Sequence, residues 1–396
     1  MTPACQRWLL FTLAVFSALL PPAATEPKPA AIPAPLAQPR DADDVGRFLA
    51  GLPATPGSPF AHLENSPAWK EHRRRLDDAW RKAETGMIRG LRDFQRQELD
   101  RAPLGNAPVF YPFGGPDALT ATLCFPRSPV YVFVGLEPAG TLPTAAQLAK
   151  KDLPGYLAGV RETMASELGR SFFITHQMDR QFRGQVTDGL LLPILQLLVR
   201  RQYTIARFRY VRIDDGGQII ERAADYQTPG KFANKGVEIE FRSDADHSVH
   251  RLYYFAANLA DERLRDNKAF LAYLSRMRGT TTLLKATSYV THRKDFSTIR
   301  DLVLANSAAI LQDDSGIPYR CFLPGLWDVL LYGDYDHPYG SFRWQVQPDL
   351  QKAYKSASPK LLSFGIGYGY ARIPSNLLLA KRANRVSAAP HPVAAP

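Results

Sequence analysis

The sequence predicts an α+β protein with mixed or antiparallel sheet regions and helices in blocks, preceded by a long amphipathic helix. Apolar residues recur at helical spacing over residues 66–99. Alternating apolar and polar residues within 203–256 indicate half-buried strands. Helical and strand-like stretches follow one another in blocks, which favours α+β over a doubly wound parallel sheet.

The first 25 residues have the pattern of a secretory signal peptide. Arg7 precedes an unbroken apolar run from Trp8 to Leu20, and small residues follow in 21–25. The run is shorter than the about 20 apolar residues that a membrane span needs, so we expect cleavage and no membrane span in the mature chain. An uncleaved anchor is the alternative. The sequence therefore predicts a periplasmic or secreted protein.

Composition divides the remaining chain into four parts. Residues 26–44 are rich in Pro and Ala and are expected to form an extended linker. Residues 45–104 form a predicted N-terminal helical segment, and 105–382 form the predicted main α+β domain. Residues 383–396 resemble the linker in composition, so we expect a disordered tail.

The helical segment contains one strong start signal. Ser66 is the expected N-cap and Pro67 the first helical residue, and the apolar stripe then continues to about Leu99.

The main domain is expected to begin with two strand-like stretches and to continue with mixed elements. Residues 109–126 and 130–138 are predicted to form an antiparallel pair, and residues 144–200 to be helical. The further predicted strands are 208–215, 218–226, 236–243 and 247–255, arranged as a meander, then 281–292 and 361–371; the further predicted helices are 261–279, 295–311 and 348–354.

The chain is basic, with a formal net charge of +11 and a sequence pI near 9.5. Such a balance favours an anionic partner, for which an anionic envelope component is the candidate, and export argues against nucleic acid. The run His72–Arg75 is expected on the polar side of a helix, and the arginines of 200–212 alternate with strand-like residues. Both are interpreted as solvated faces.

The stretch Asp314-Ser315-Gly316, with Pro318 beyond it, is similar to the nucleophile loop of chymotrypsin-like serine proteases. Its surroundings argue against that activity. A predicted helix precedes it, and no histidine stands in a matching context. Asp313 also puts a carboxylate where backbone donors must receive developing negative charge. We interpret the stretch as a helix exit with Gly316 in the left-handed conformation.

Four carboxylates are candidates for catalysis: Asp117, Glu137, Asp313 and Asp314. Asp117 ends a Gly/Pro turn among aromatic residues, and Glu137 ends an apolar strand. Paired carboxylates beside aromatic rings suit acid/base chemistry on sugars. The alternative is that each one caps a turn or is satisfied by local hydrogen bonds.

The sequence predicts neither a cofactor nor a metal. The G-x-G of residues 364–369 lacks the strand-to-helix context of a nucleotide site. The acidic turn around Asp334, Asp336 and His337 departs from the calcium-loop pattern.

Cys124 and Cys321 are disulfide candidates, because they are the cysteines that follow the predicted signal in an oxidising compartment. Asp117 and Asp314 each stand seven residues before one of them. A disulfide would therefore bring the two acidic loops into one neighbourhood.

Several segments carry a resemblance: YPFGGPDALTATLCFP, VYVFVGLEPAG, and ILQDDSGIPYRCF with PSNLLLAKR. They resemble parts of an uncharacterised family of exported bacterial proteins, over most of residues 105–382. The resemblance implies that these segments form one folded unit, and it assigns no activity or catalytic residue.

Two functions are compatible with these observations. A non-catalytic envelope protein, binding or structural, is favoured because no residue spacing meets a catalytic template. The alternative is a hydrolase of an envelope glycan that uses two of the four carboxylates in a cleft lined by Tyr111, Phe113 or Trp327. Whether the protein is an enzyme is left open.

Overall fold

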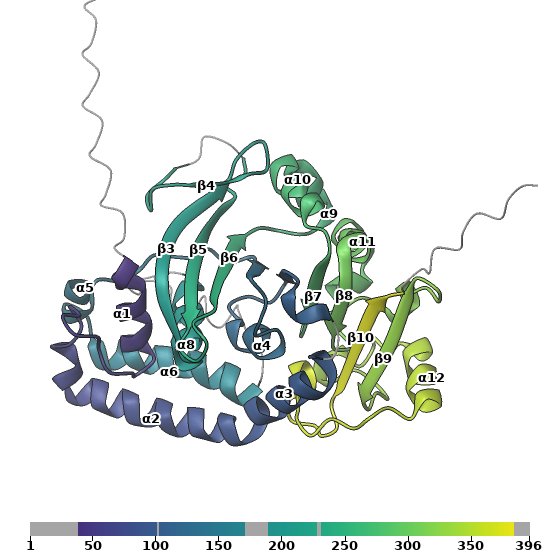
Figure 1. Ribbon diagram of the computed structural model, residues 1–396, viewed down its shortest axis with the longest axis horizontal. Coiled ribbons are helices and arrows are strands. Elements are labelled where there is room, and N and C mark those ends of the chain that lie inside the picture. Colours follow the sequence, from purple (N-terminus) through teal and green to yellow (C-terminus); the bar gives the residue numbers. More distant parts are fainter. Residues whose placement is uncertain (1–38, 101–102, 171–188, 228–230, 384–396) are drawn as a thin grey trace, which may run out of the picture. The chain divides into compact units, whose positions relative to one another are not determined.

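A ten-stranded mixed sheet with helices confirms the predicted α+β class (Figure 1). The strand order is β4-β3-β5-β6-β2-β1-β7-β8-β10-β9. The bounds are β1 Val109–Pro112, β2 Val130–Gly135, β3 Tyr203–Ile213, β4 Ile219–Glu221, β5 Lys235–Ser243, β6 Val249–Ala256, β7 Thr280–Leu284, β8 Ser307–Gln312, β9 Trp327–Gly333 and β10 Asn376–Arg382. The computed structural model describes residues 39–100, 103–170, 189–227 and 231–383. The predicted signal peptide, most of the linker and nearly all of the tail lie outside these ranges.

The centre of the sheet is parallel: β6, β2, β1, β7 and β8 all run in one direction. The predicted antiparallel pairing of 109–126 with 130–138 is therefore wrong. The reason is α4 (Ala118–Cys124), a fully buried helix within the first stretch. Its short apolar run has no periodicity that distinguishes a buried helix from a strand. The helix carries the chain back, so that β2 starts at the same end of the sheet as β1.

Antiparallel strands flank this centre. On one side β3 pairs with both β4 and β5, and β5 pairs with β6. The predicted strands and hairpins are thus present, although β3 and not β4 lies beside β5. On the other side β10 lies antiparallel between β8 and β9.

Three predictions in the C-terminal half are wrong at least in part. The predicted strand 281–292 ends at Leu284, the last residue of β7. The predicted helix 295–311 ends at Asn306, where α11 (Ser297–Asn306) passes directly into β8. The predicted strand 361–371 is a loop with one short 3-10 turn, and the last strand is β10. Glycines at 365, 367 and 369 allow the chain to turn in this loop where aromatic residues had suggested a strand.

Helices cover both faces of the sheet. Along β2, Tyr131 and Phe133 belong to one buried core, whereas Val132 and Val134 belong to another. The first core includes side chains of α1 (Pro39–Leu49), α2 (Pro67–Ala83), α3 (Arg89–Phe94), α4, α5 (Ala145–Ala149), α6 (Leu153–Arg170) and α8 (Leu191–Arg200). The second includes side chains of α9 (Asp261–Asp266), α10 (Lys268–Arg276), α11 and α12 (Pro348–Ala357). The parallel centre is thus the middle layer of an α/β/α sandwich.

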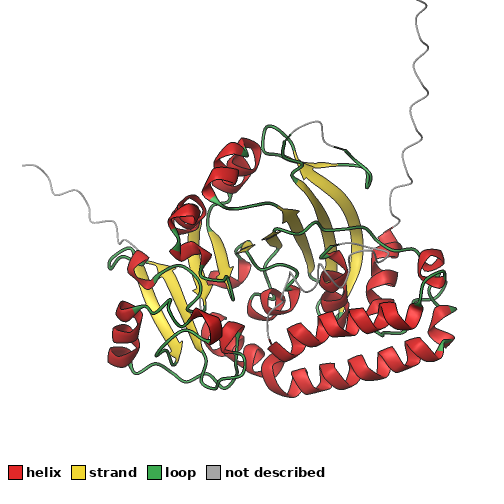
Figure 2. Ribbon diagram, turned by 180° about the vertical axis from the view of Figure 1, so that it is seen from behind, coloured by secondary structure: helices red, strands yellow, loops and turns green. Residues whose placement is uncertain are grey.

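The predicted long helix is present and begins as expected. The Ser66 hydroxyl accepts a hydrogen bond from the Trp69 amide at 3.2 Å, with Pro67 in the first turn. Helical structure continues through π turns to Leu99. Figure 2 shows α2 and α6 side by side as the two longest helices. Helix α1 begins at Pro39, within the predicted linker.

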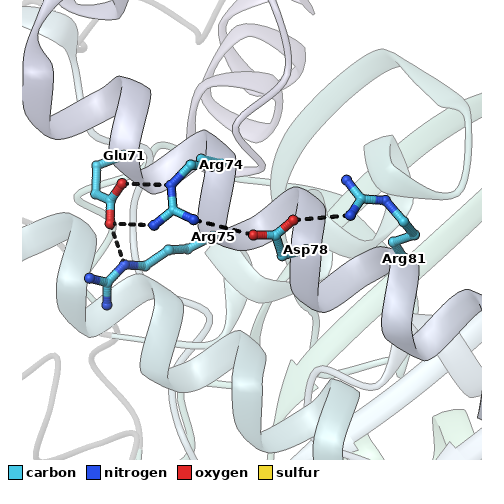
Figure 3. Close-up of polar contacts among 5 residues, drawn as sticks. All are labelled: Glu71, Arg74, Arg75, Asp78 and Arg81. Carbon is cyan, nitrogen blue, oxygen red and sulfur yellow. Dashed lines mark hydrogen bonds and ion pairs between the residues drawn. The ribbon is translucent and has the colours of Figure 1, made fainter.

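The basic run on α2 is a solvated face, as predicted, apart from its first residue. Figure 3 shows Glu71 accepting hydrogen bonds from Arg74 and Arg75, and Asp78 accepting from Arg74 and Arg81. These side chains are exposed and lie three or four residues apart, the spacing of surface ion pairs on a helix.

His72 is the exception, because it is fully buried and its Nε2 lies 2.8 Å from the Leu49 carbonyl oxygen. Within the described ranges, no helix is long and apolar enough to cross a membrane.

Candidate functional site

The parallel strands bring the predicted carboxylates to one edge of the sheet. Asp117 follows β1, Glu137 follows β2, and Asp313 and Asp314 follow β8. Across the sheet, the parallel strands are arranged β6-β2-β1-β7-β8. When they are numbered by their order along the chain, this arrangement reads 3-2-1-4-5, which is the order of dinucleotide-binding sheets. In such sheets ligands bind at the carboxyl ends where the order reverses, here between β1 and β7.

A pocket of about 430 Å³ lies at this edge, within the usual range for small-molecule sites. Its lining comes from the segments that follow β1, β2, β6 and β7 and from two C-terminal loops. The lining residues are Phe113, Gly115, Val134, Gly135, Leu136, Glu137, Ala257, Asn258, Leu259, Ala286, Thr287, Ser288, Val290, Phe296, Phe342 and Tyr368. Among these, Glu137 is the one charged side chain.

The backbone at Glu137 is held from the neighbouring strand. Tyr254 on β6 donates its hydroxyl hydrogen to the Glu137 carbonyl oxygen at 2.6 Å. Gly135 permits this contact, because a Cβ there would lie 2.5 Å from the Tyr254 hydroxyl oxygen. The Glu137 side chain is half-buried and is thus available to a ligand in the pocket.

Asp117 is buried and caps α4. One carboxylate oxygen accepts the Thr120 amide at 2.9 Å, and the other accepts the Tyr111 hydroxyl at 2.7 Å. The capping interpretation of Asp117 is therefore confirmed, with an aromatic residue of β1 as a second partner.

Lys285, the first residue after β7, lies at the centre of the buried charges. Its Nζ is 2.7 Å from Asp117 Oδ2, 2.8 Å from Thr120 Oγ1 and 3.7 Å from Glu167 Oε1. Burial lowers the pKa of Lys285, but the Asp117 carboxylate outweighs this effect and leaves the pKa above its ordinary value. Lys285 therefore carries its charge inside the protein.

Glu167, on α6, is uncharged, whereas Lys285 is charged. Burial raises its pKa well above the ordinary range, and the Asp117 carboxylate raises it further. Neither carboxyl oxygen of Glu167 has a hydrogen-bond partner of ordinary geometry among the described residues. A neutral Glu167 beside an ion pair of Asp117 and Lys285 balances the buried charge.

Asp313 holds the loop that follows β7. Its Oδ2 accepts the Ala286 amide at 2.9 Å, and its Oδ1 accepts the Ser315 amide at 3.0 Å. Within this loop Ala286, Ser288 and Tyr289 all have left-handed backbone angles, with φ of 52°, 54° and 55°. Three non-glycine residues in this region within four positions are costly, and such strain is typical of functional loops.

Asp314 is fixed from another direction. Asn376 Nδ2 donates to Asp314 Oδ1 at 3.0 Å, Asn376 Oδ1 accepts the Asp314 amide at 2.8 Å, and the Tyr289 hydroxyl donates to Asp314 Oδ2. Burial raises the pKa of Asp314 to about 7, and nearby Asp313 adds to the shift.

Ser315 has none of the properties of a nucleophile. Its side chain is fully buried, its Oγ accepts the Thr287 amide at 2.8 Å and donates to Asp313. The Asp-Asp-Ser-Gly stretch follows β8 and not a helix, and Gly316 does not have a positive φ. The predicted helix exit with a left-handed Gly316 is therefore wrong, because the buried strand β8 takes the place of the last turns of the predicted helix.

A glycine of the C-terminal loop packs directly against Asp313. Gly367 has a φ of 56°, and a Cβ at this position would lie 2.1 Å from Asp313 Oδ2. The next residue, Tyr368, donates to the Ala286 carbonyl oxygen at 3.1 Å and lines the pocket. The G-x-G of residues 364–369 thus lies against the site, although it does not connect a strand to a helix as a phosphate loop does.

The structure brings the two acidic loops together without the expected disulfide. Cys124 and Cys321 are both free thiols. Cys124 belongs to the core on one face of the sheet, and Cys321 packs against the core on the other face. Asp117 and Asp313 are neighbours of Lys285 because they follow adjacent parallel strands, which is a different cause from the one predicted.

Sequence reasoning missed the residues that organise the site. Lys285 had a usable signal, because it directly follows the apolar strand Thr280–Leu284 and a charge there needs a buried partner. Glu167, Phe342 and Tyr368 had none, because their partners are distant in sequence and no local pattern points to them.

The geometry supports binding better than catalysis. Glu137 reaches the pocket, whereas Asp117, Asp313 and Asp314 are 1%, 3% and 5% exposed and are committed to hydrogen bonds. The described residues also contain no cluster of three or more side chains suited to a metal ion. No protein-family model matches the chain, and no curated protein or solved structure is detectably similar to it.

Proposed function

We propose that this protein binds a nucleoside-type ligand, with its ribose on Glu137 and its base among the aromatic side chains of the pocket. The observation that carries the proposal is the position of the pocket at the reversal point of the parallel strands, with an acidic residue at the end of the second strand. The protein acts as a binding protein, and its export to the cell envelope, expected from residues 1–25, is part of the proposal.

The ribose assignment rests on spacing. In dinucleotide-binding sheets an acidic residue about 20 residues beyond the first glycine turn accepts hydrogen bonds from the ribose hydroxyls. Gly114 and Gly115 form the turn after β1, and Glu137 stands at that distance at the end of β2. Glu137 lines the pocket and is partly exposed, and a carboxylate can accept two hydroxyl groups.

The base assignment rests on two pairs of rings. Phe113 and Phe296 are packed edge to face with centroids 6.0 Å apart, and Phe342 and Tyr368 lie 4.8 Å apart. All four line the pocket. Flat apolar rings of this kind bind a planar base by stacking.

The site is not built for a diphosphate. The glycine fingerprint of dinucleotide-binding proteins places pyrophosphate on the free amides of a helix N-terminus. Here Asp117 caps α4 and accepts the Thr120 amide. The cap takes up an amide that a phosphate would need, so the ligand is a nucleoside without a phosphate at the β1–α4 turn.

Hydrolysis of an envelope glycan has less support. It needs two carboxylates that face one cleft. Glu137 alone lines the pocket among the four predicted carboxylates. Of the predicted aromatic residues, Phe113 lines the pocket, whereas Tyr111 is buried against Asp117 and Trp327, at the start of β9, is buried outside the pocket lining.

Thermal unfolding in the presence of ligands tests the proposal. A ligand that binds the native state raises the unfolding temperature in proportion to RT ln(1 + [L]/Kd). We expect adenosine at millimolar concentration to raise it and glucose to have no effect. Phe342→Ala should remove the effect of adenosine. Trp344→Ala is the matched control, because Trp344 is 75% exposed and lies outside the lining. A response to glucose with none to adenosine would contradict the nucleoside assignment.

A further inference from the structure

The charges in and beneath the pocket determine whether a cationic or an anionic ligand is favoured. The described lining residues include the Glu137 carboxylate and no lysine, arginine or histidine. A phosphate or carboxylate group in this pocket would meet a like charge and no counterion, at a cost of desolvation that nothing in the lining offsets.

The buried layer beneath the pocket offers an anionic ligand no free counterion. Lys285 is paired with Asp117, while Asp313 and Asp314 receive hydrogen bonds from neutral donors only. Ala286 and Thr287, which line the pocket, are the residues directly after Lys285. The single buried cation of this group is thus already neutralised.

Arg293, an exposed cation beside the lining residue Phe296, is also occupied. Arg293 lies 5.7 Å from the centre of the Phe296 ring and is paired with Asp295 at 2.6 Å. Its position shows that the Phe296 face accepts a cation. Aromatic ring faces attract positive charge in general, as aromatic cages around ammonium groups do.

We propose that the natural ligand carries a positive charge, as an ammonium or sulfonium group on the nucleoside, and that phosphorylated nucleosides are rejected. This inference rests on the proposed function, because it concerns the same pocket. Glu137, the one charged residue of the described lining, selects the cation and opposes an anion.

A matched set of adenosines tests the inference with the intact mature chain. The compounds are adenosine, 5′-amino-5′-deoxyadenosine and 5′-adenosine monophosphate, which differ at the 5′ position alone. By calorimetry we expect the ammonium compound to bind about tenfold more tightly than adenosine and the phosphate at least about tenfold more weakly, each step being about 1.4 kcal/mol. A phosphate that binds as tightly as the ammonium compound overturns the inference and leaves the nucleoside proposal standing.

A second pair of probes is independent of the nucleoside. Choline and its uncharged isostere 3,3-dimethylbutan-1-ol differ in the charged nitrogen. Preferential binding of choline without any adenosine binding supports the cation preference and rejects the nucleoside. Equal affinity for the two, or no binding of either, overturns the cation preference.

Variants assign the preference to the pocket. Glu137→Gln should reduce the advantage of the ammonium compound at least about threefold, whereas Glu162→Gln, the same change on the exposed side of α6, should leave it unchanged. An unchanged advantage in a folded Glu137→Gln protein would place the cation elsewhere and overturn the assignment.

Discussion

Lys285 and Asp117 form a fully buried ion pair, with 2.7 Å between Nζ and Oδ2 and both side chains 2% exposed. Lys285 follows β7 and Asp117 follows the adjacent strand β1, so the pair joins the two chain segments on either side of the strand-order reversal. An electrostatic contact between residues far apart in sequence therefore lies next to the pocket-lining residue Ala286.

Removing the cation should destabilise the fold strongly. Lys285→Met leaves Asp117 without its counterion in the interior, and breaking a buried pair in this way costs about 3–5 kcal/mol. Lys352→Met, an exposed position on α12, should change the free energy of unfolding by less than about 0.5 kcal/mol. Urea denaturation followed by circular dichroism measures both. A Lys285→Met protein within about 1 kcal/mol of wild type would show that the pair contributes little.

Asp314 should make stability depend on pH. Its pKa is about 7 in the folded protein, against about 3.9 in an unfolded chain. Between these values the native state holds a proton that the unfolded chain has lost. The free energy of unfolding should therefore fall as pH rises from about 4 to about 7, by up to about 1.4 kcal/mol per pH unit, and then level off.

Asp314→Asn isolates this contribution, because the amide stays neutral: its oxygen can accept from Asn376, and its nitrogen can donate to the Tyr289 hydroxyl oxygen. His72 and His292, whose pKa values burial lowers to about 4, act in the opposite direction and cancel in the difference between wild type and variant. Denaturation at a series of pH values, with Asp328→Asn as the exposed control, measures that difference. A difference that is constant from pH 4 to pH 7 would contradict the assignment.

Gly367 should not tolerate a side chain. Its φ of 56° already disfavours other residues, and a Cβ would lie 2.1 Å from Asp313 Oδ2. We expect Gly367→Ala to cost about 2 kcal/mol or more. Gly86→Ala is the control, because nothing lies within 4 Å of its Cβ position, and it should be neutral or stabilising by about 0.5–1 kcal/mol. Equal thermal stability of the two variants would mean that the loop is not fixed against Asp313.

The cysteines should be chemically distinct. Burial raises the pKa of Cys124 to about 12, whereas Cys321 is half-buried. In a chain that lacks residues 1–25, a thiol reagent should modify Cys321 under native conditions and Cys124 only after unfolding. Cys321→Ser should abolish the native reaction. Unfolded protein without free thiols in the absence of reductant would show that the two cysteines form a disulfide after all.

The sequence predicted local structure well and long-range pairing less well. The start of α2 at Ser66 and Pro67 and the strands around Gly216 depend on neighbouring residues, so their signals were visible. The direction of β2 relative to β1 depends on whether the seven buried residues Ala118–Cys124 form a helix, and buried residues of either structure have the same composition.

For the candidate site, too, the individual residues could be predicted but their arrangement in space could not. Asp117, Glu137, Asp313 and Asp314 were recognised because acidic residues beside apolar strands stand out. Their meeting at one edge depends on the parallel order of β1, β7 and β8, which no local pattern indicates. The seven-residue spacing before each cysteine suggested the right neighbourhood for the wrong reason.

The central claim is that Glu137 binds the ribose of a nucleoside in the pocket at the ends of the parallel strands. The most direct measurement is calorimetric titration of adenosine and 2′,3′-dideoxyadenosine into wild type, Glu137→Gln and the control Glu162→Gln. Loss of the two hydroxyls should weaken binding about tenfold in wild type and in the control, as expected for hydrogen bonds to a charged group, and have little effect in Glu137→Gln. Equal affinity of wild type for both compounds, or the same loss in all three proteins, would contradict the account.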